Sequence, residues 1–140
     1  MQLDFALLAD YAYTDNHQKF FILGEFRYVH APSVPYTHHR MVLAARILAD
    51  ATEVRDQQAQ VQMELTDSDG NPVVPRSPEV ALRFVPVGSA RPAMWMALLT
   101  AEISGLQLPR WGDYSIHIFT NGIRLGDVSF TLNQIPTRQA

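Results

Sequence analysis

An Asn-Gly pair near the C-terminal end restricts the fold more than any other feature of this sequence. Asn121-Gly122 tolerates the positive φ angles that a two-residue type I′ turn requires at both central positions. Runs of β-branched and aromatic residues flank the pair, at 114–119 and 123–132. This pattern predicts a β-hairpin.

The two runs do not match in register without an irregularity. Uninterrupted pairing away from the turn would place Ile116 opposite Asp127 and direct a carboxylate toward the core. One extra residue at Gly126-Asp127 would instead set Ile116 opposite Val128. We therefore expect a β-bulge of structural importance at Gly126.

Alternation of apolar and polar residues predicts further strands along the chain. Tyr114, two residues after Gly112, resembles the tyrosine corner of sandwich folds, in which the ring is buried and its hydroxyl bonds upstream backbone. The Leu and Ala content of 38–50 leaves a helix open there. We predict one all-β domain over residues 1–140, a two-sheet antiparallel β-sandwich of about eight strands. The expected strands are 3–13, 20–29, 38–50, 60–66, 79–85, 94–103, 114–119 and 123–132.

Composition narrows the classes of function. The sequence has no cysteine, which excludes disulfides, thiolate catalysis and zinc-thiolate sites. A net charge of −3, with Lys19 the sole lysine, gives no basic surface, so we expect no nucleic-acid partner. The first residues lack a signal-peptide pattern, and no apolar run approaches the roughly 20 residues of a membrane span. We expect a cytoplasmic protein without a membrane partner.

One acidic loop resembles a metal site. Asp67, Asp69 and Asn71 surround Gly70 like the opening of a calcium-binding loop. Prolines follow at 72 and 75, where such a loop would need its bidentate Glu. An Asp-Gly-Asn turn between strands explains the same residues.

Histidines could also bind a metal, since imidazole is the ligand that remains without cysteine. His38 and His39 are adjacent, so on a strand they point to opposite faces. His30 could converge with one of them across a proline loop. We expect surface or loop histidines and no cofactor, with a weak His30–His38 site as the alternative.

No catalytic motif stands out. The sequence contains neither a Gly-x-Ser-x-Gly elbow nor a glycine-rich phosphate loop. Asp4, Asp10 and Glu25 could form a carboxylate cluster, but outward charges that blunt strand edges are commoner. We predict no catalytic residues and no enzyme.

Three predicted strands, 3–13, 20–29 and 94–103, are richer in apolar residues than one core face requires. Phe119 is also out of phase with Ile116 and Ile118. The outer face of a sandwich normally contacts water, so a proline-rich loop or another copy of the chain should cover it. We therefore expect a protein-association module, most simply a homodimer, with an unidentified protein partner also open. The expected interface residues are Phe119, His117, Phe21 and Leu8.

A small-ligand or carbohydrate-binding module is the alternative function. Trp111 follows Arg110 in a turn, where its ring is either tucked under the sandwich or offered to a partner. Exposed aromatic rings stack on sugars, and nearby polar side chains orient them. The expected ligand contacts are Trp111, Arg110 and Asp113.

Several short segments together resemble a known family. They are Leu7–Ala12, Phe21–Gly24, the Ala31–Ser33 loop, and the closing Pro-x-x-Gly-x-Tyr to Asn-Gly hairpin. These resemble a bacterial family of small all-β proteins classed as a domain of unknown function. The resemblance spans nearly the whole chain. It implies a compact sandwich and supplies no activity, cofactor or catalytic residue.

Overall fold

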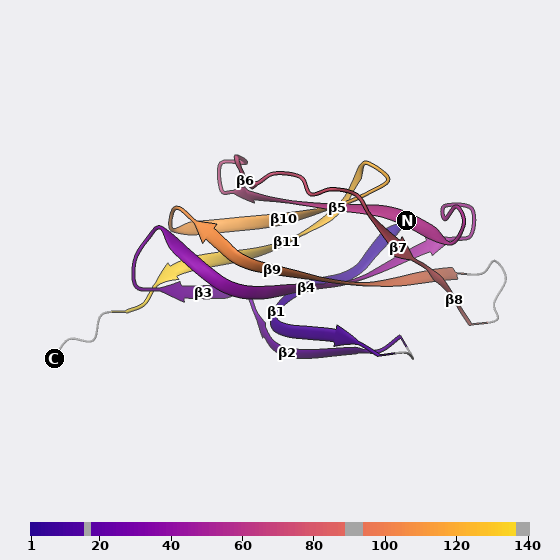
Figure 1. Cartoon of the computed structure of the whole chain (residues 1–140), viewed down its shortest axis with the longest axis horizontal. Coiled ribbons are helices and arrows are strands. Elements are labelled where there is room, and N and C mark those ends of the chain that lie inside the picture. Colours follow the sequence, from indigo (N-terminus) through magenta and orange to yellow (C-terminus); the bar gives the residue numbers. More distant parts are fainter. Residues whose placement is uncertain (16–17, 89–93, 137–140) are drawn as a thin grey trace.

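The computed structural model describes residues 1–15, 18–88 and 94–136, and these residues contain eleven strands and no helix (Figure 1). The predicted all-β fold is confirmed, although the strands number more than eight. Residues 16 and 17 of the polar turn that follows β1 lie outside the described residues. The strands are β1 (Gln2–Thr14), β2 (Phe20–Phe26), β3 (Tyr28–Ala31), β4 (Tyr36–Asp50), β5 (Gln58–Asp67), β6 (Pro72–Val74), β7 (Val80–Arg83), β8 (Val85–Val87), β9 (Met94–Leu108), β10 (Gly112–Thr120) and β11 (Ile123–Gln134).

The strands form two sheets that pack face to face. The β4 sheet has the order β2-β1-β4-β9-β8, and the β10 sheet has the order β3-β11-β10-β5-β6, with β7 also beside β5. Every pair is antiparallel except β3 and β11, which run parallel. The main core lies between the sheets and includes the buried side chains of Leu8, Met41, Leu43, Leu65, Tyr114, Ile116, Ile118 and Phe130.

The β10–β11 hairpin has the predicted turn and nearly the predicted register. Asn121 and Gly122 have φ angles of 50° and 79°, and Ile116 faces Val128. The extra residue is Leu125, however, because Arg124 pairs with Phe119 while Gly126 already pairs with Ile118. The bulge therefore lies one position earlier than predicted.

Gly126 has a different role from the one predicted. A Cβ at this position would lie 2.8 Å from Leu3 Cδ2. Glycine therefore allows β11 to approach β1 closely without displacing the Leu3 side chain, which would have to shift to admit a Cβ here.

The predicted tyrosine corner is confirmed. Tyr114 is buried, and its hydroxyl donates to the Arg110 carbonyl at 2.6 Å. The Arg110 N–H donates back to the same hydroxyl at 3.1 Å. These two bonds fix the entry into β10.

The predicted strand 20–29 is wrong, because it divides at Arg27 between the two sheets. β2 pairs with β1 in the β4 sheet, whereas β3 pairs with β11 in the β10 sheet. The Arg27 carbonyl accepts a hydrogen bond from Thr131 N–H at 2.9 Å at the crossing point. Phe26 and Val29 both pack in the main core, which explains why the segment is apolar at positions of opposite phase.

The β1–β2 hairpin covers the outer face of the β4 sheet. Its Ala12 packs against Val42 and Ala44 of β4 in a cluster separate from the main core, which Leu7, Phe20 and Ile22 complete. Figure 1 shows the hairpin on the side of β4 opposite β5 and β10. Part of the apolar surface of β1 and β2 is thus buried within the chain itself.

Gly24 lets the hairpin take this course. Its φ is +70°, and a Cβ there would overlap the Asp10 carboxylate. Only glycine adopts this conformation without strain.

Candidate functional site

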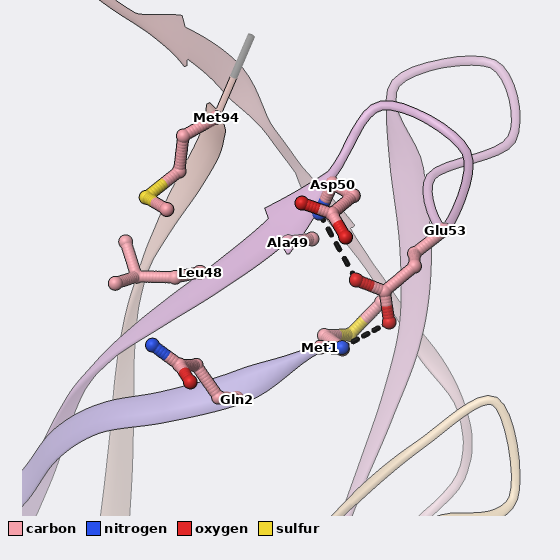
Figure 2. A pocket seen from close by; sticks show the side chains of 7 residues that line it. All are labelled: Met1, Gln2, Leu48, Ala49, Asp50, Glu53 and Met94. Carbon is pink, nitrogen blue, oxygen red and sulfur yellow. Dashed lines mark hydrogen bonds and ion pairs between the residues drawn. The ribbon is translucent and has the colours of Figure 1, made fainter. Parts of the chain in front are cut away.

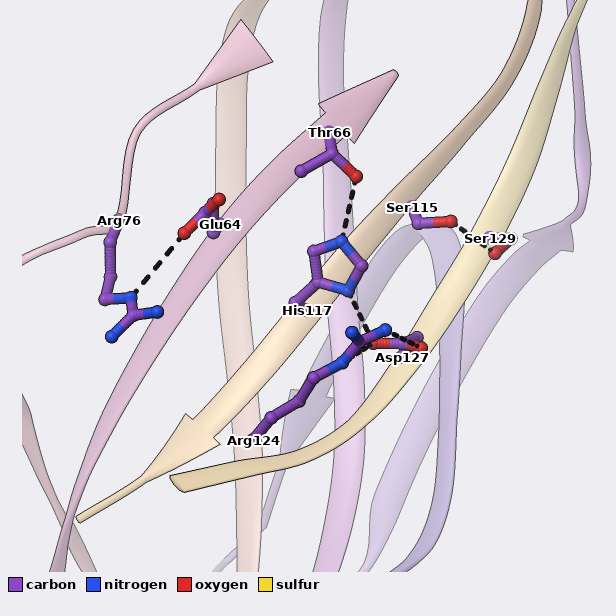
Figure 3. A network of polar contacts seen from close by, with 8 residues as sticks. All are labelled: Glu64, Thr66, Arg76, Ser115, His117, Arg124, Asp127 and Ser129. Carbon is purple, nitrogen blue, oxygen red and sulfur yellow. Dashed lines mark hydrogen bonds and ion pairs between the residues drawn. The ribbon is translucent and has the colours of Figure 1, made fainter. Parts of the chain in front are cut away.

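A row of polar side chains crosses the outer face of the β10 sheet (Figure 3). Thr66 Oγ1 of β5 lies 2.8 Å from Nε2 of His117 on β10. The other ring nitrogen of His117, Nδ1, lies 2.5 Å from Asp127 Oδ1 of β11. Arg124 donates to the same carboxylate through Nε at 2.9 Å and a terminal nitrogen at 2.5 Å.

The charge of Asp127 is held in place by its neighbours. Burial raises the pKa of Asp127, but hydrogen bonds from Arg124 and His117 outweigh this effect and keep the pKa below its usual value. The carboxylate is therefore an ion over a wide pH range.

The hydroxyl–imidazole–carboxylate order resembles the triad of hydrolases. A nucleophile must reach its substrate, however, and Thr66 is buried. A cavity of about 260 Å³ is lined by Asp127, but by neither Thr66 nor His117. The row therefore joins three strands, and the hydroxyl and the imidazole do not face that cavity.

Sequence reasoning missed this row, although part of the signal was present. The predicted bulge already sets His117 opposite Asp127, since it sets Ile116 opposite Val128. Thr66 lies 51 residues from His117, and nothing local in the sequence pairs β5 with β10. His117 was expected at an interface, but its two ring nitrogens are engaged within the chain.

Phe119 is covered by its own chain. Only 9% of the residue is exposed, and the Arg76 guanidinium lies 3.7 Å from the ring centroid. Ser77 N–H donates to the Met63 carbonyl at 2.8 Å and fastens this proline-rich segment to β5. The cover is thus the loop, which was one of the two expected alternatives, so we remove Phe119 from the interface.

The predicted ligand contacts do not converge. Arg110 pairs with Asp67 at 2.5 Å, Asp113 accepts a hydrogen bond from Thr131 at 2.6 Å, and the Trp111 ring stays partly exposed. A cavity of about 400 Å³ is lined by Arg110 and Asp67, but by neither Trp111 nor Asp113.

The acidic loop is the predicted turn between strands, and it is of the Asx type. Asp67 Oδ1 accepts hydrogen bonds from the N–H groups of Asp69 at 3.0 Å and Asn71 at 2.9 Å. The Asn71 bond, followed by Asp69 and Arg110, lowers the pKa of Asp67. Within the described ranges, no three His, Cys, Asp or Glu side chains form a group that could hold a metal ion.

His38 lies between two aromatic rings and does not form such a site with His30. Its ring centroid is 6.0 Å from those of Phe26 and Tyr36. Burial lowers the pKa of His38 below 6.5, against weaker opposing effects from Arg40 and Asp10. His30 is exposed on β3.

Two further cavities differ in character. One of about 200 Å³ lies where β1, β4 and β9 meet, and there Glu53 contacts the Met1 amino group and accepts a hydrogen bond from Asp50 N–H at 3.0 Å (Figure 2). The other, of about 300 Å³, lies between β5 and β9. Its lining is mostly apolar and comes from Met63, Glu64, Leu65, Val74, Ser77, Glu102, Ile103, Ser104, Leu106 and Ile116.

The exposed side of the β1–β2 hairpin carries the clearest surface feature. Four large apolar side chains there are between 40% and 62% exposed, and we call them the aromatic face: Tyr11, Tyr13, Phe21 and Leu23. The rings of Tyr13 and Phe21 stack at 4.7 Å with an interplanar angle of 7°. The Arg40 guanidinium lies 4.9 Å from the Tyr11 centroid.

Of the interface residues expected from the sequence, Phe21 belongs to the aromatic face and Leu8 does not. Leu8 is 1% exposed and packs in the main core. Both phases of β1 are apolar, so the sequence did not distinguish its inner from its outer side chains.

No helix in the part of the chain that the structure describes is long and apolar enough to cross a membrane. No curated protein matches the sequence significantly. Among solved structures, the chain is similar to a Pseudomonas fluorescens alkylpurine DNA glycosylase, AlkC, bound to DNA containing an abasic site analog, at 17% identity and a TM-score of 0.46. That match covers 76% of this chain but only 28% of the glycosylase chain, and it carries no argument about function.

A sequence model of a family of unknown function, DUF6941, matches residues 4–133. The match includes both the hairpin that bears the aromatic face and the closing β10–β11 hairpin. This chain therefore belongs to that family.

Proposed function

We propose that this protein is a non-enzymatic association module that self-associates through the aromatic face of the β1–β2 hairpin. The observation that carries the proposal is that Tyr11, Tyr13, Phe21 and Leu23 stay exposed together on one side of the hairpin. The opposite side of the same hairpin packs against β4 through Ala12, with Phe20 and Ile22 partly buried beside it. A contiguous exposed apolar patch of this kind is typical of interaction sites.

The chemistry of the face suits a protein partner. Aromatic side chains bring large contact areas, and tyrosine is enriched at interfaces because its hydroxyl tolerates water while its ring is buried. A second copy is the simplest partner, since two-fold dimers are the commonest oligomers. We also propose a cytoplasmic location, which the absence of cysteine supports.

The test compares two substitutions of exposed apolar residues. Leu23→Asp places a charge in the aromatic face, whereas Ile123→Asp places one on β11, at a residue that is 73% exposed. We expect Leu23→Asp to raise the dimer dissociation constant at least about 10-fold, the weakening typical of a central interface residue. Ile123→Asp should leave it unchanged. Sedimentation equilibrium over a concentration series measures both.

An unmodified chain that stays monomeric up to high micromolar concentration would contradict the proposal. Small-ligand binding would then move ahead, and the mostly apolar cavity of about 300 Å³ between β5 and β9 would be its site. A rise in melting temperature on adding a ligand would support that alternative.

A further inference from the structure

The strands at the ends of the two sheets differ in how well they are protected from further pairing. β8 and β6 have three residues each and contain proline, and the four-residue β3 is followed by Pro32. Short length and proline are the usual means of blunting an edge. β2 has seven residues without proline and ends the β4 sheet. It is the edge best able to accept another strand.

The hydrogen bonds at the start of β2 show which residues face that edge. Asp15 N–H donates to the Lys19 carbonyl at 3.1 Å, so Lys19 directs its backbone toward β1. The direction alternates along an antiparallel ladder. The N–H and C=O groups of Phe20 and Ile22 therefore point away from β1, toward the free edge. Antiparallel pairing of β2 with another β2 must join residues of the same parity.

We propose that two copies of the chain pair antiparallel along β2, with Ile22 on the two-fold axis; this inference rests on the self-association proposed above. In this register Phe21 lies opposite Leu23 of the second copy. Lys19 lies opposite Glu25 of the second copy. Both charge pairs and both apolar pairs are complementary by symmetry.

The two adjacent registers are poorer. Centring on Leu23 would set Lys19 opposite Arg27 and Phe21 opposite Glu25, which joins like charges and pairs an aromatic ring with a carboxylate. Centring on Phe21 would set Lys19 opposite Leu23. Like charges directly opposite one another destabilise a strand pair. The sequence of the edge thus selects the Ile22 register.

The Ile22 register also joins the two aromatic faces. Tyr13 pairs with Phe21 across the hairpin, and Tyr11 pairs with Leu23. Across the axis, the side chains therefore follow one another in the order Tyr13 and Phe21 of one copy, then Leu23 and Tyr11 of the second copy. The two five-stranded sheets become one continuous sheet, and Phe21 and Leu23 of each aromatic face contact the second copy directly across the axis.

Zero-length cross-linking of the unmodified protein tests the register directly. A carbodiimide joins an amine to a carboxylate in contact with it, and Lys19 is the sole lysine. In a mixture of isotopically light and heavy chains, we expect a mixed-isotope amide between Lys19 and Glu25. Glu25→Gln should abolish it. An inter-chain amide from Lys19 to a different carboxylate, or none in a protein that dimerises, would overturn the register.

Charge exchange gives a second, independent measurement. Lys19→Glu and Glu25→Lys alone should each raise the dimer dissociation constant several-fold, because each creates two like-charge pairs. The double variant should restore dimerisation. Glu25→Lys also loses the 3.7 Å contact to Arg27, but the double variant shares that loss, so recovery isolates the inter-chain pair.

The outcomes separate this inference from the function on which it rests. A dimer that Leu23→Asp weakens but that shows neither the amide nor the recovery would overturn the Ile22 register and leave self-association standing. A monomeric unmodified chain would overturn both.

Discussion

The outer face of the β4 sheet has an apolar centre that lies under a hairpin, flanked by the ion pairs of Arg40 with Glu102 and of Arg46 with Asp4. The outer face of the β10 sheet instead carries a row of polar side chains that bond one another. Val42 and Ala44 on the first face pack against Ala12 of the hairpin. On the second, Thr66, His117 and Asp127 bond one another across three strands. The hairpin that covers the first face has a second apolar side, which faces away from β4. The apolar exposure therefore lies on the aromatic face of the hairpin, whereas on the β10 sheet the loop segment with Arg76 covers Phe119 and leaves it 9% exposed.

The largest loss of stability should come from a substitution that disturbs the β1–β2 hairpin. Gly24→Ala forces a side chain into a positive φ and against the Asp10 carboxylate, and we expect a loss of about 2 kcal/mol in the free energy of unfolding. Chemical denaturation measures this loss. Gly88→Ala is the matched control, since Gly88 has a φ of +69° with no atom within 4 Å of the added Cβ, and should cost about 1 kcal/mol. Equal losses would show that the contact with Asp10 is unimportant.

The polar face should respond less, and in stability alone. Asp127→Asn removes the charge that Arg124 and His117 share, and we expect a loss of about 1 kcal/mol in the free energy of unfolding. Asp113→Asn is the control on the same sheet, because Asp113 accepts only a neutral hydroxyl donor, Thr131, at 2.6 Å. The dimer dissociation constant should stay unchanged in both variants. A shift in that constant for Asp127→Asn would mean that the two faces are not independent.

Mild acid should give the smallest effect and should act first through His38, whose ring lies beside Phe26 and Tyr36 at the main core. Burial lowers the pKa of His38 below 6.5, so the unfolded chain takes up its proton at a higher pH than the folded chain does. The free energy of unfolding should therefore fall as the pH drops below about 6.5. Asp67 and Asp127 have pKa values lowered from 3.8, so their contributions are lost only below that pH.

The measurement compares unfolding at pH 7.5 and pH 5.5. His38→Leu should remove part of the decrease between these two pH values. An identical decrease in the unmodified protein and in His38→Leu would assign it to other groups.

Local chemistry made the closing β10–β11 hairpin and the corner before it predictable, whereas the expected strand 79–85 divides into β7 and β8, which join different sheets. The Asn121-Gly122 turn and the Tyr114 corner each depend on residues close in sequence, whose conformational demands are specific. The break at Arg27 was not predictable, because alternation shows which side chains share a face but not which sheet a strand joins. The bulge at Leu125 was misplaced by one residue, since Gly126 reads equally well as a bulge or as a point of close packing.

The sequence predicted that an apolar surface exists, but not which residues form its exposed part. Apolar excess in the first two strands indicated a covered or shared surface, and Phe21 lies on the exposed part of it. Phe119 was also expected at this surface because it is out of phase, but Arg76, in the segment between β6 and β7, lies over its ring. Such coverage depends on the path of a proline-rich segment, which has no periodicity from which a contact can be inferred.

The long ladder between β4 and β9 has a consequence for how the chain is made. It runs from Tyr36 opposite Leu108 to Asp50 opposite Met94. One edge of β4 therefore stays unpaired until the ribosome has added the residues of β9. Pairings of such sequence separation close slowly. β1 and β2, by contrast, are already present when β4 emerges and can occupy its other edge and its outer face. The N-terminal hairpin would then shield the nascent strand during translation.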